Sequence, residues 1–142
     1  MNAVVEAARG WIGTPYRHQA SCRGAGADCL GLIRGIWREV LGPEPVKVPA
    51  YSMDWSEPQG EERLWEAAMA HLVPLPPGAQ RAGDVILFRM RNGAVAKHLG
   101  LVSVPDERFI HAYNRRGVVE SPMSAPWKRR IVARFAFPER DG

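Results

Sequence analysis

The sequence predicts an α+β fold, with helices in the N-terminal half and an antiparallel sheet in the C-terminal half. Apolar residues recur at helical spacing as far as Leu72, whereas after Asp84 they alternate along short runs rich in β-branched and aromatic residues. Helices followed by strands, rather than the two in regular alternation, are typical of the α+β class. The chain has 142 residues, 46% of them hydrophobic, so we expect a single domain over residues 1–142 with an ordinary core.

Two helices are expected in the first third of the chain, separated by a loop over residues 13–27 that Gly, Pro and Ser punctuate. Asn2 is placed to cap the first helix. Its apolar positions are Val4, Val5, Ala8, Trp11 and Ile12. Asp28 is placed to cap the second helix, and Gly42-Pro43 to end it. Its apolar stripe contains Leu32, Ile33, Ile36, Trp37, Val40 and Leu41.

A third helix is expected to begin near Ser56, because Ser56 and Gln59 have capping-box spacing and Pro58 suits a first turn. Its apolar face comprises Leu64, Trp65, Ala68, Met69 and Leu72. Four or five short antiparallel strands are expected after this helix. They cover residues 84–90, 98–104, 108–113, 117–120 and 131–137.

Cys29 stands where the glycine-rich segment Gly24–Asp28 meets the second helix. If Asp28 caps that helix, Cys29 lies in the first turn, where unpaired N–H groups and the helix dipole favour a thiolate and could bind an oxyanion. The negative charge of Asp28 acts against the thiolate. Position alone leaves two interpretations open, a nucleophile or a small buried cysteine at a helix start.

His98 and His111 fall on two strands that are neighbours along the chain. We expect a hairpin turn at Pro105-Asp106, with Val104 opposite Glu107. In this register the two imidazoles point to the same face of the sheet as diagonal neighbours, whereas a slip of one residue would separate them.

A general base must lie within hydrogen-bond reach of its nucleophile, and a third group must fix its tautomer. Cys29, His98 and His111 meet this requirement if the second helix packs against the face that carries the histidines. Taken alone, each histidine is more often a partly buried core or surface residue than a catalyst.

The other candidate residues carry weaker signals. His18 could line a pocket or lie on the surface of its loop, and His71 suits the C-terminal end of the third helix as a structural residue. Cys22 and Cys29 lack zinc-site spacing and the two-residue spacing of redox motifs, so no metal is expected and a redox pair is a weak alternative.

The formal net charge of +4 favours an anionic partner such as nucleic acid, a membrane surface or an acidic wall polymer. From charge alone a mildly basic, solvated surface is the preferred explanation, because the clusters Arg115-Arg116 and Lys128–Arg130 are short. The N-terminal residues do not resemble a signal peptide, and no apolar run reaches the ~18 residues of a membrane span. We therefore expect synthesis in the cytoplasm without a signal peptide and no membrane insertion.

Several motifs together suggest a family. The segments GTPYRHQASCRGAGADCLGLIRGIW, RAGDVILF, KHLGLV and FIHAY occur in the order found in NlpC-type cell-wall peptidases. These are papain-like cysteine peptidases that cut peptidoglycan stem peptides, and the resemblance covers nearly the whole chain. GTPYRHQAS together with DCLGLIRG most resembles the phage and gene-transfer-agent branch. The resemblance implies the papain-like NlpC fold, with N-terminal helices packed on a C-terminal antiparallel sheet.

The resemblance also implies roles for individual residues. Cys29 matches the nucleophile, His98 the general base that later acts as an acid, and His111 the polar residue that orients the base. Tyr16 matches a tyrosine beside the nucleophile, and Asp28 matches the acidic residue before it.

Two departures from the family pattern concern the shape of the subsites. Leu30 stands where many members have serine, and Arg17–Gln19 stand where an aromatic residue and glycines are common.

The activity implied by the resemblance is acyl transfer from a peptidoglycan stem peptide to water, without metal or cofactor. The expected bond joins γ-D-glutamate to a diamino acid. The expected partners are phage-type tail-tip proteins rather than nucleic acid, and the expected place is a virion or gene-transfer-agent tail that acts in the periplasm or cell wall and aids DNA passage. A non-catalytic tail-tip docking module and a thiol acyltransferase or amidase on the same scaffold are the alternatives.

Overall fold

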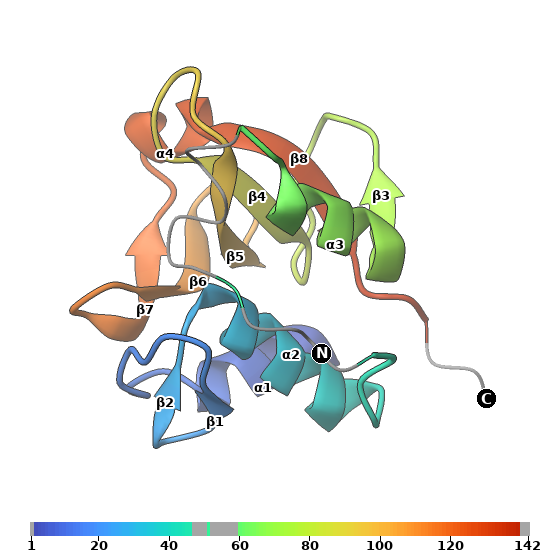
Figure 1. The fold of residues 1–142 in the computed structure, drawn as a ribbon, viewed down its shortest axis with the longest axis vertical. Helices are drawn as coiled ribbons and strands as arrows, with labels where there is room; N and C mark the ends of the chain where they lie inside the picture. The colour runs from blue at the N-terminus through green and yellow to red at the C-terminus, as the bar shows by residue number, and fades with distance from the viewer. Residues whose placement is uncertain (1, 47–50, 52–59, 140–142) are drawn as a thin grey trace.

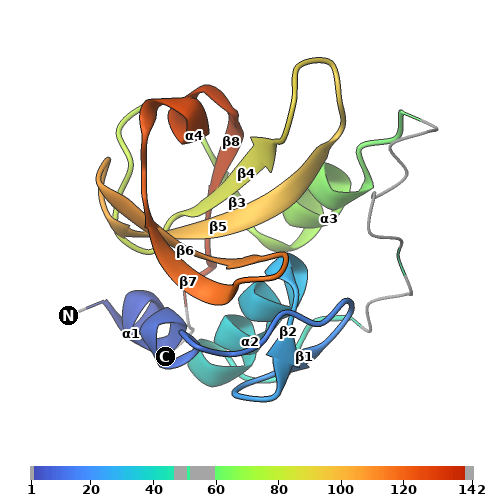
Figure 2. The same ribbon diagram turned by 90° about the vertical axis from the view of Figure 1, so that its left-hand side faces the viewer.

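The computed structural model describes residues 2–46, 51 and 60–139. Its main sheet is antiparallel and has the strand order β3-β8-β4-β5-β6-β7. These strands are β3 (Val73–Leu75), β4 (Val85–Arg89), β5 (Ala96–Val104), β6 (Arg108–Tyr113), β7 (Gly117–Pro122) and β8 (Ile131–Ala136). Helices α1 (Ala3–Gly10), α2 (Cys29–Val40) and α3 (Arg63–His71) cover one face, and α4 (Ala125–Arg129) lies on the other side (Figures 1 and 2). The α+β prediction is confirmed.

Helix α1 begins at the predicted cap. The Asn2 side chain accepts hydrogen bonds from the backbone N–H groups of Val4 and Val5, which satisfies two of the free donors at the helix start. Trp11 is buried against α2, but Ile12 is 43% exposed, so the prediction that Ile12 belongs to the apolar face is wrong. The helix ends at Gly10, one residue before Trp11, and the chain then turns away from the helical period.

Helix α2 also begins at its predicted cap, because one carboxylate oxygen of Asp28 accepts a hydrogen bond of 2.7 Å from the Gly31 N–H. Gly35 lets α1 approach closely. A Cβ atom at Gly35 would lie 2.0 Å from the Trp11 ring, so any larger residue would push the two helices apart. The two helices are therefore fixed against each other next to the start of α2.

The structure differs from the predicted elements at several places. The segment expected as a loop contains a short hairpin of β1 (Ser21–Cys22) and β2 (Gly26–Ala27), and strand β3 and helix α4 were not predicted. Helix α3 begins at Arg63 rather than near Ser56, because Gly60 has a φ of +70° that a right-handed helix cannot contain. Met69 on this helix is 52% exposed and does not belong to its buried face. The proposed capping residues Ser56 and Gln59, and Pro58, lie outside the described residues.

The main sheet is buried on both faces, and the alternation along β4 shows how. Val85 and Leu87 join the large core between the sheet and the helices, whereas Ile86 and Phe88 point to a smaller core on the opposite face. The smaller core also contains Val102, Phe109 and Met123, with Trp127 of α4 packed against it. The central strands β4, β5 and β6 therefore present side chains to two separate cores.

The hairpin between β5 and β6 forms at the predicted turn, where the Glu107 N–H donates to the Val104 carbonyl over 2.9 Å. The predicted pairing of Val104 with Glu107 is wrong, because Val104 pairs with Arg108. A register shift between Val102 and Val104 absorbs one residue, so Leu101 pairs with Ile110 further along. This returns the strands to the predicted phase before they reach the histidines.

Among the helices of residues 2–46, 51 and 60–139, none has the length and hydropathy that crossing a bilayer requires.

Candidate active site

Cys29 is the first residue of α2 and is 6% exposed. Its sulfur lies 3.9 Å from the carbonyl oxygen of Lys97 at the start of β5. A cavity of about 320 Å³ opens beside it between the N-terminal end of α2 and the neighbouring ends of β5 and β6. The residues that line it are Tyr16, His18, Asp28, Cys29, Met90, Lys97, His98, Ala112, Tyr113 and Asn114.

The two histidines form a hydrogen-bonded pair. Nε2 of His98 lies 2.7 Å from Nδ1 of His111, and Nε2 of His111 lies 2.8 Å from the Ser121 hydroxyl on β7. The prediction that the imidazoles lie as neighbours on one face is confirmed. His98 lines the cavity, whereas His111 is 1% exposed and lies behind it.

Aromatic rings surround the histidine pair and exclude water from it. The ring centroid of Trp127 in α4 lies 5.7 Å from that of His98 and 5.2 Å from that of His111. The ring centroids of Phe109 and His111 are 4.3 Å apart. Burial, and then the neighbouring His111, lower the pKa of His98 to about 3. Burial lowers the pKa of His111 to about 4. Both imidazoles are therefore neutral at pH 7.

Helix α2 reaches the histidines in a different way from the one predicted. Its buried side chains contact Leu99 and Ile110, which point to the large core, whereas His98 and His111 point to the opposite face among the smaller core's aromatic residues. The helix does not pack on the histidine face. Only Cys29, in its first turn, reaches the cavity that His98 lines from the other side.

Asp28 joins three segments at the start of α2. Besides capping the helix, its carboxylate accepts hydrogen bonds from the Gln19 N–H at 2.7 Å and from the Tyr51 hydroxyl at 2.5 Å. Nδ1 of His18 lies 3.7 Å from the same carboxylate. Asp28 is 2% exposed, and these donors compensate the cost of burying its charge. The carboxylate therefore fixes the loop before Cys29 to the first turn of the helix.

Gly31 allows this loop to lie against the helix. A Cβ atom at Gly31 would come within 1.8 Å of the Ala20 carbonyl oxygen, which is well inside van der Waals contact. The Ser21 hydroxyl then donates to the Gly31 carbonyl over 2.6 Å. The position of the helix start, and with it that of Cys29, depends on glycine at residue 31.

The electrostatic environment of Cys29 is a balance of opposing contributions. Burial, followed by the charge of Asp28, raises the pKa of the thiol to about 12. Backbone N–H groups of Leu99, Leu30 and Cys29 itself lower it. The helix start thus acts in the predicted direction, but burial outweighs it, and the resting side chain is a neutral thiol.

Tyr16 and His18 both lie in the cavity wall. The resemblance implies this position for Tyr16, whereas the sequence left His18 open between a pocket and the surface of its loop. Burial, followed by the charges of Cys29 and Asp28, raises the pKa of Tyr16 to about 12, so its hydroxyl is available as a neutral donor. His18 donates from Nε2 to the Tyr51 carbonyl over 2.9 Å and meets the Tyr51 ring edge to face. All the predicted site residues are therefore brought together, five in the cavity wall and His111 behind it.

Several residues of the site were not predicted. Tyr113 was not predicted as a site residue, although the predicted register of the hairpin places it opposite His98. Ser121 lies one residue beyond the predicted end of its strand. Tyr51 and Trp127 carry no signal in the sequence, because only the packing of distant segments brings them to Asp28 and to the histidines.

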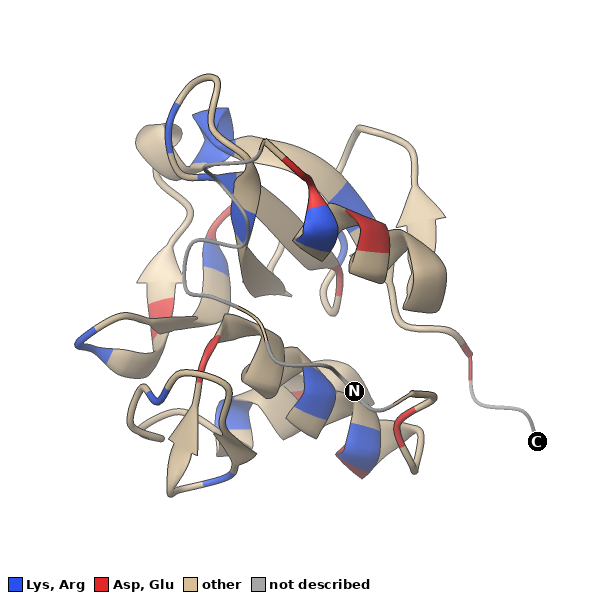
Figure 3. Cartoon of the chain, viewed as in Figure 1, with Lys and Arg blue, Asp and Glu red and all other residues tan. Residues whose placement is uncertain are grey.

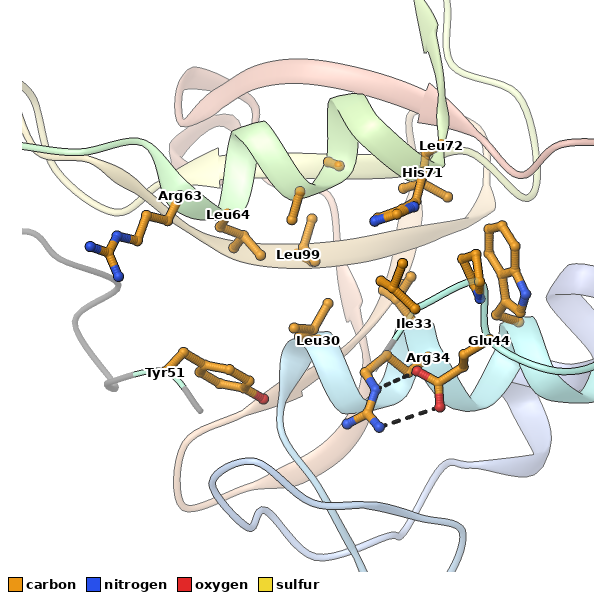
Figure 4. Close-up of a pocket in the computed structure, with 15 residues that line it drawn as sticks. Leu30, Ile33, Arg34, Glu44, Tyr51, Arg63, Leu64, His71, Leu72 and Leu99 are labelled. Atoms are coloured by element: carbon orange, nitrogen blue, oxygen red, sulfur yellow. Dashed lines mark hydrogen bonds and ion pairs between the residues drawn. The ribbon is translucent and has the colours of Figure 1, made fainter. Parts of the chain in front are cut away.

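A second, apolar cavity of about 240 Å³ lies between α2 and α3 (Figure 4). Leu30 and Leu99, the residues that follow Cys29 and His98, line it from opposite sides. At its edge the guanidinium of Arg34 donates to the Glu44 carboxylate over 2.6 Å. Leu30 thus supplies an apolar wall to this cavity.

The described part of the chain contains no group of three or more His, Cys, Asp or Glu side chains that could hold a metal ion. Its cysteines are both free, Cys22 exposed and Cys29 buried.

These contacts define the class of the site: a cysteine at a helix N-terminus shares one cavity with a histidine that is hydrogen-bonded to a second histidine, which are residue types used in nucleophilic thiol chemistry. The particular family follows from the sequence. The chain belongs to the NlpC/P60 family, whose profile matches residues 13–135.

Relatives and solved structures agree with this assignment. The chain is 28% identical over 121 residues to the murein DD-endopeptidase MepS/murein LD-carboxypeptidase of Escherichia coli K12, which covers 84% of this chain and 54% of that protein. It is 26% identical over 117 residues to a probable endopeptidase of Haemophilus influenzae, covering 82% and 62% of the two chains. This chain therefore spans about half the length of the Escherichia coli relative.

Among solved structures, the NlpC/p60 domain of the peptidoglycan hydrolase SagA superposes with a TM-score of 0.60 at 22% identity, covering 96% of this chain and 100% of that domain. An NlpC/P60 family protein from Bacillus cereus superposes with a TM-score of 0.63 at 18% identity, covering 94% of this chain and 39% of that one. These likenesses show the fold.

Proposed function

We propose that this chain is a thiol-dependent peptidase that hydrolyses stem peptides of bacterial peptidoglycan. The observation that carries the proposal is that Cys29 and His98 line one cavity while His98 is hydrogen-bonded to His111 at 2.7 Å. The relatives support the substrate class, because the Escherichia coli relative is named a murein endopeptidase and carboxypeptidase.

The hydrogen bonds of the histidine pair indicate where its protons lie. For His98 to accept a proton at Nδ1, its Nε2–H must donate to Nδ1 of His111. His111 then carries its own proton on Nε2 and donates it to the Ser121 hydroxyl. In this arrangement each ring holds one proton, and His98 presents a free lone pair as general base.

Because the resting thiol and imidazole are both neutral, the proton leaves Cys29 as the sulfur attacks rather than beforehand. The thiol must also turn, since it contacts the Lys97 carbonyl and forms no hydrogen bond with His98 within the described residues. The sulfur bonds to the peptide carbonyl carbon, and the N–H groups at the start of α2 are placed to hold the resulting oxyanion. His98 then protonates the leaving amine, and water attacks the acyl-enzyme and releases the acid.

The finer assignment has two candidates. The sequence resemblance favours the bond between γ-D-glutamate and a diamino acid, with delivery by a phage-type tail to aid DNA passage. The name of the Escherichia coli relative, a murein DD-endopeptidase and LD-carboxypeptidase, favours a DD peptide bond of murein as the second candidate.

The test is mass spectrometry of purified peptidoglycan after digestion with the wild-type protein and with Cys29→Ala. We expect new stem-peptide fragments from the wild type alone, and their masses distinguish the two bonds. Fragments joined to an acceptor other than water would indicate an acyltransferase. Equal release by both proteins, or no release by a folded wild type over walls of several compositions, would refute the proposal and favour a docking module.

A further inference from the structure

A second polar cavity, of about 390 Å³, opens beside the cavity of Cys29 and is rich in arginine. Its basic residues come from the end of β4, the loop after it, and the junction of α4 with β8. In Figure 3 these basic segments gather at one end of the molecule, at the upper left. The residues that line it are Arg89, Met90, Arg91, Asn92, Pro126, Arg129, Arg130 and Val132. We call it the arginine cavity.

Two of its four arginines have no acidic counterpart among the residues that the structure describes. Neither Arg129 nor Arg130 forms an ion pair with any residue that the structure describes. Arg89 pairs with Glu62 at 3.0 Å, yet its buried Nε has no hydrogen-bond partner within the described residues. The cavity therefore offers guanidinium donors to an anion.

The segments that carry Arg89 and Arg130 are also held in place. The Arg89 N–H donates to the Arg130 carbonyl over 2.8 Å, which ties the end of β4 to the start of β8. The guanidinium of Arg130 lies 5.4 Å from the centre of the Trp127 ring, close enough for a cation–π contact. A site with fixed donors loses less entropy when it binds a ligand than a set of mobile side chains does.

The arginine cavity continues the cavity of Cys29. Met90 lines both cavities, and Trp127, which contacts Arg130, also contacts the His98 ring at 5.7 Å. Because His98 must protonate the leaving amine, the part of the substrate attached to that amine lies on the His98 side of Cys29. The leaving part of a bound peptide therefore extends toward the arginines.

We propose that the arginine cavity is an anion-binding subsite for a free carboxylate on the leaving part of the substrate peptide. This inference rests on the proposed peptidase function. Guanidinium groups bind carboxylates through paired, charge-assisted hydrogen bonds, and a diamino acid joined through one amine carries such a carboxylate. The subsite distinguishes peptides with a free carboxylate there from peptides in which it is an amide.

The experiment measures two tripeptides, L-alanyl-γ-D-glutamyl-diaminopimelic acid and its twin with both terminal carboxylates converted to carboxamides. Equilibrium binding is measured in proteins that carry Cys29→Ala, so that the peptides are not cleaved. Cleavage is measured in the same proteins with Cys29 intact. We expect the carboxylate form to bind about fivefold to tenfold more tightly at low salt, with less preference at ~0.5 M salt. Arg129→Gln/Arg130→Gln should bring the ratio close to one.

Arg108→Gln is the matched control, because Arg108 is exposed at the end of β6 that lies away from Tyr113 and Asn114 of the catalytic cavity. It removes the same charge and should keep the wild-type ratio. Equal binding of the two peptides by the wild type, or the same loss of preference in Arg108→Gln, would overturn the subsite. Loss of oligonucleotide binding in Arg129→Gln/Arg130→Gln, without any preference of the wild type between the two peptides, would also overturn the subsite. A binding preference without cleavage would instead refute the peptidase and retain the subsite.

Discussion

Lowering the pH from 7 to 5 should destabilise the folded protein through its buried histidine pair. Burial lowers the pKa of His98 to about 3 and of His111 to about 4, whereas histidines in an unfolded chain titrate near ~6.5. The unfolded state therefore binds more protons below pH ~6.5, and stability is lost as the pH falls toward the folded values. Well above pH ~6.5 both histidines are neutral in the folded and the unfolded state, and they no longer make the stability depend on pH.

The size of the effect follows from the difference in protonation. Each histidine that stays neutral in the fold costs about 1.4 kcal/mol per pH unit below its unfolded pKa, or about 2 kcal/mol at pH 5. The pair costs about 4 kcal/mol, a large part of the stability of a typical domain. For a chain of this size that corresponds to a fall in melting temperature of roughly 13 °C.

Urea unfolding at a series of pH values between 5 and 7 measures this directly. In the wild type, the slope of the unfolding free energy against pH should approach the uptake of two protons on unfolding near pH 5. In His98→Gln/His111→Gln the same slope should be close to zero. His71→Gln removes a histidine outside the pair and should retain the acid response. A wild-type slope well below one proton, or an equal slope in the double variant, would show that the two rings are not held neutral by the fold.

Three further predictions concern the support of the site. Ser121→Ala removes the partner of His111 and should lower kcat about tenfold with little change in KM, whereas Ser121→Thr should restore it; equal kcat in all three proteins would refute the relay. Tyr51→Phe leaves one buried oxygen of Asp28 with fewer donors and should cost about 1–3 kcal/mol in urea unfolding, so an unchanged midpoint would show that the hydroxyl contributes nothing. Gly31→Ala places a methyl group against the Ala20 carbonyl and should lower the free energy of unfolding by roughly 1–3 kcal/mol, which lowers the melting temperature by several degrees. A melting temperature equal to that of the wild type would contradict the close approach of this loop to the helix.

The helix starts were predictable because their causes are local. Asn2 and Asp28 each bond to N–H groups two or three residues away, so the capping residue and the following apolar period suffice to find them. The start of α3 was misplaced because a capping-box pattern near Ser56 is a weak signal next to a left-handed glycine at residue 60.

The histidine pair was predictable for a related reason. Side chains alternate along a strand, so the hairpin turn between β5 and β6 determines which residues share a face. The prediction survived an error at Val104, because the bulge that follows restored the register before His98 and His111 were reached. Without that bulge the two rings would face opposite cores.

By itself the sequence determined the α+β class, the caps of α1 and α2, and the family, because each of these can be recognised from local patterns and motifs in the chain. The tertiary structure alone decided that α2 packs on the face opposite the histidines, that Cys29 rests as a neutral thiol, and that Ser121 and Trp127 complete the site. Burial and charge at a buried group depend on what distant segments bring near it. The packing of the whole chain determines these contributions, so a local sequence pattern cannot predict them.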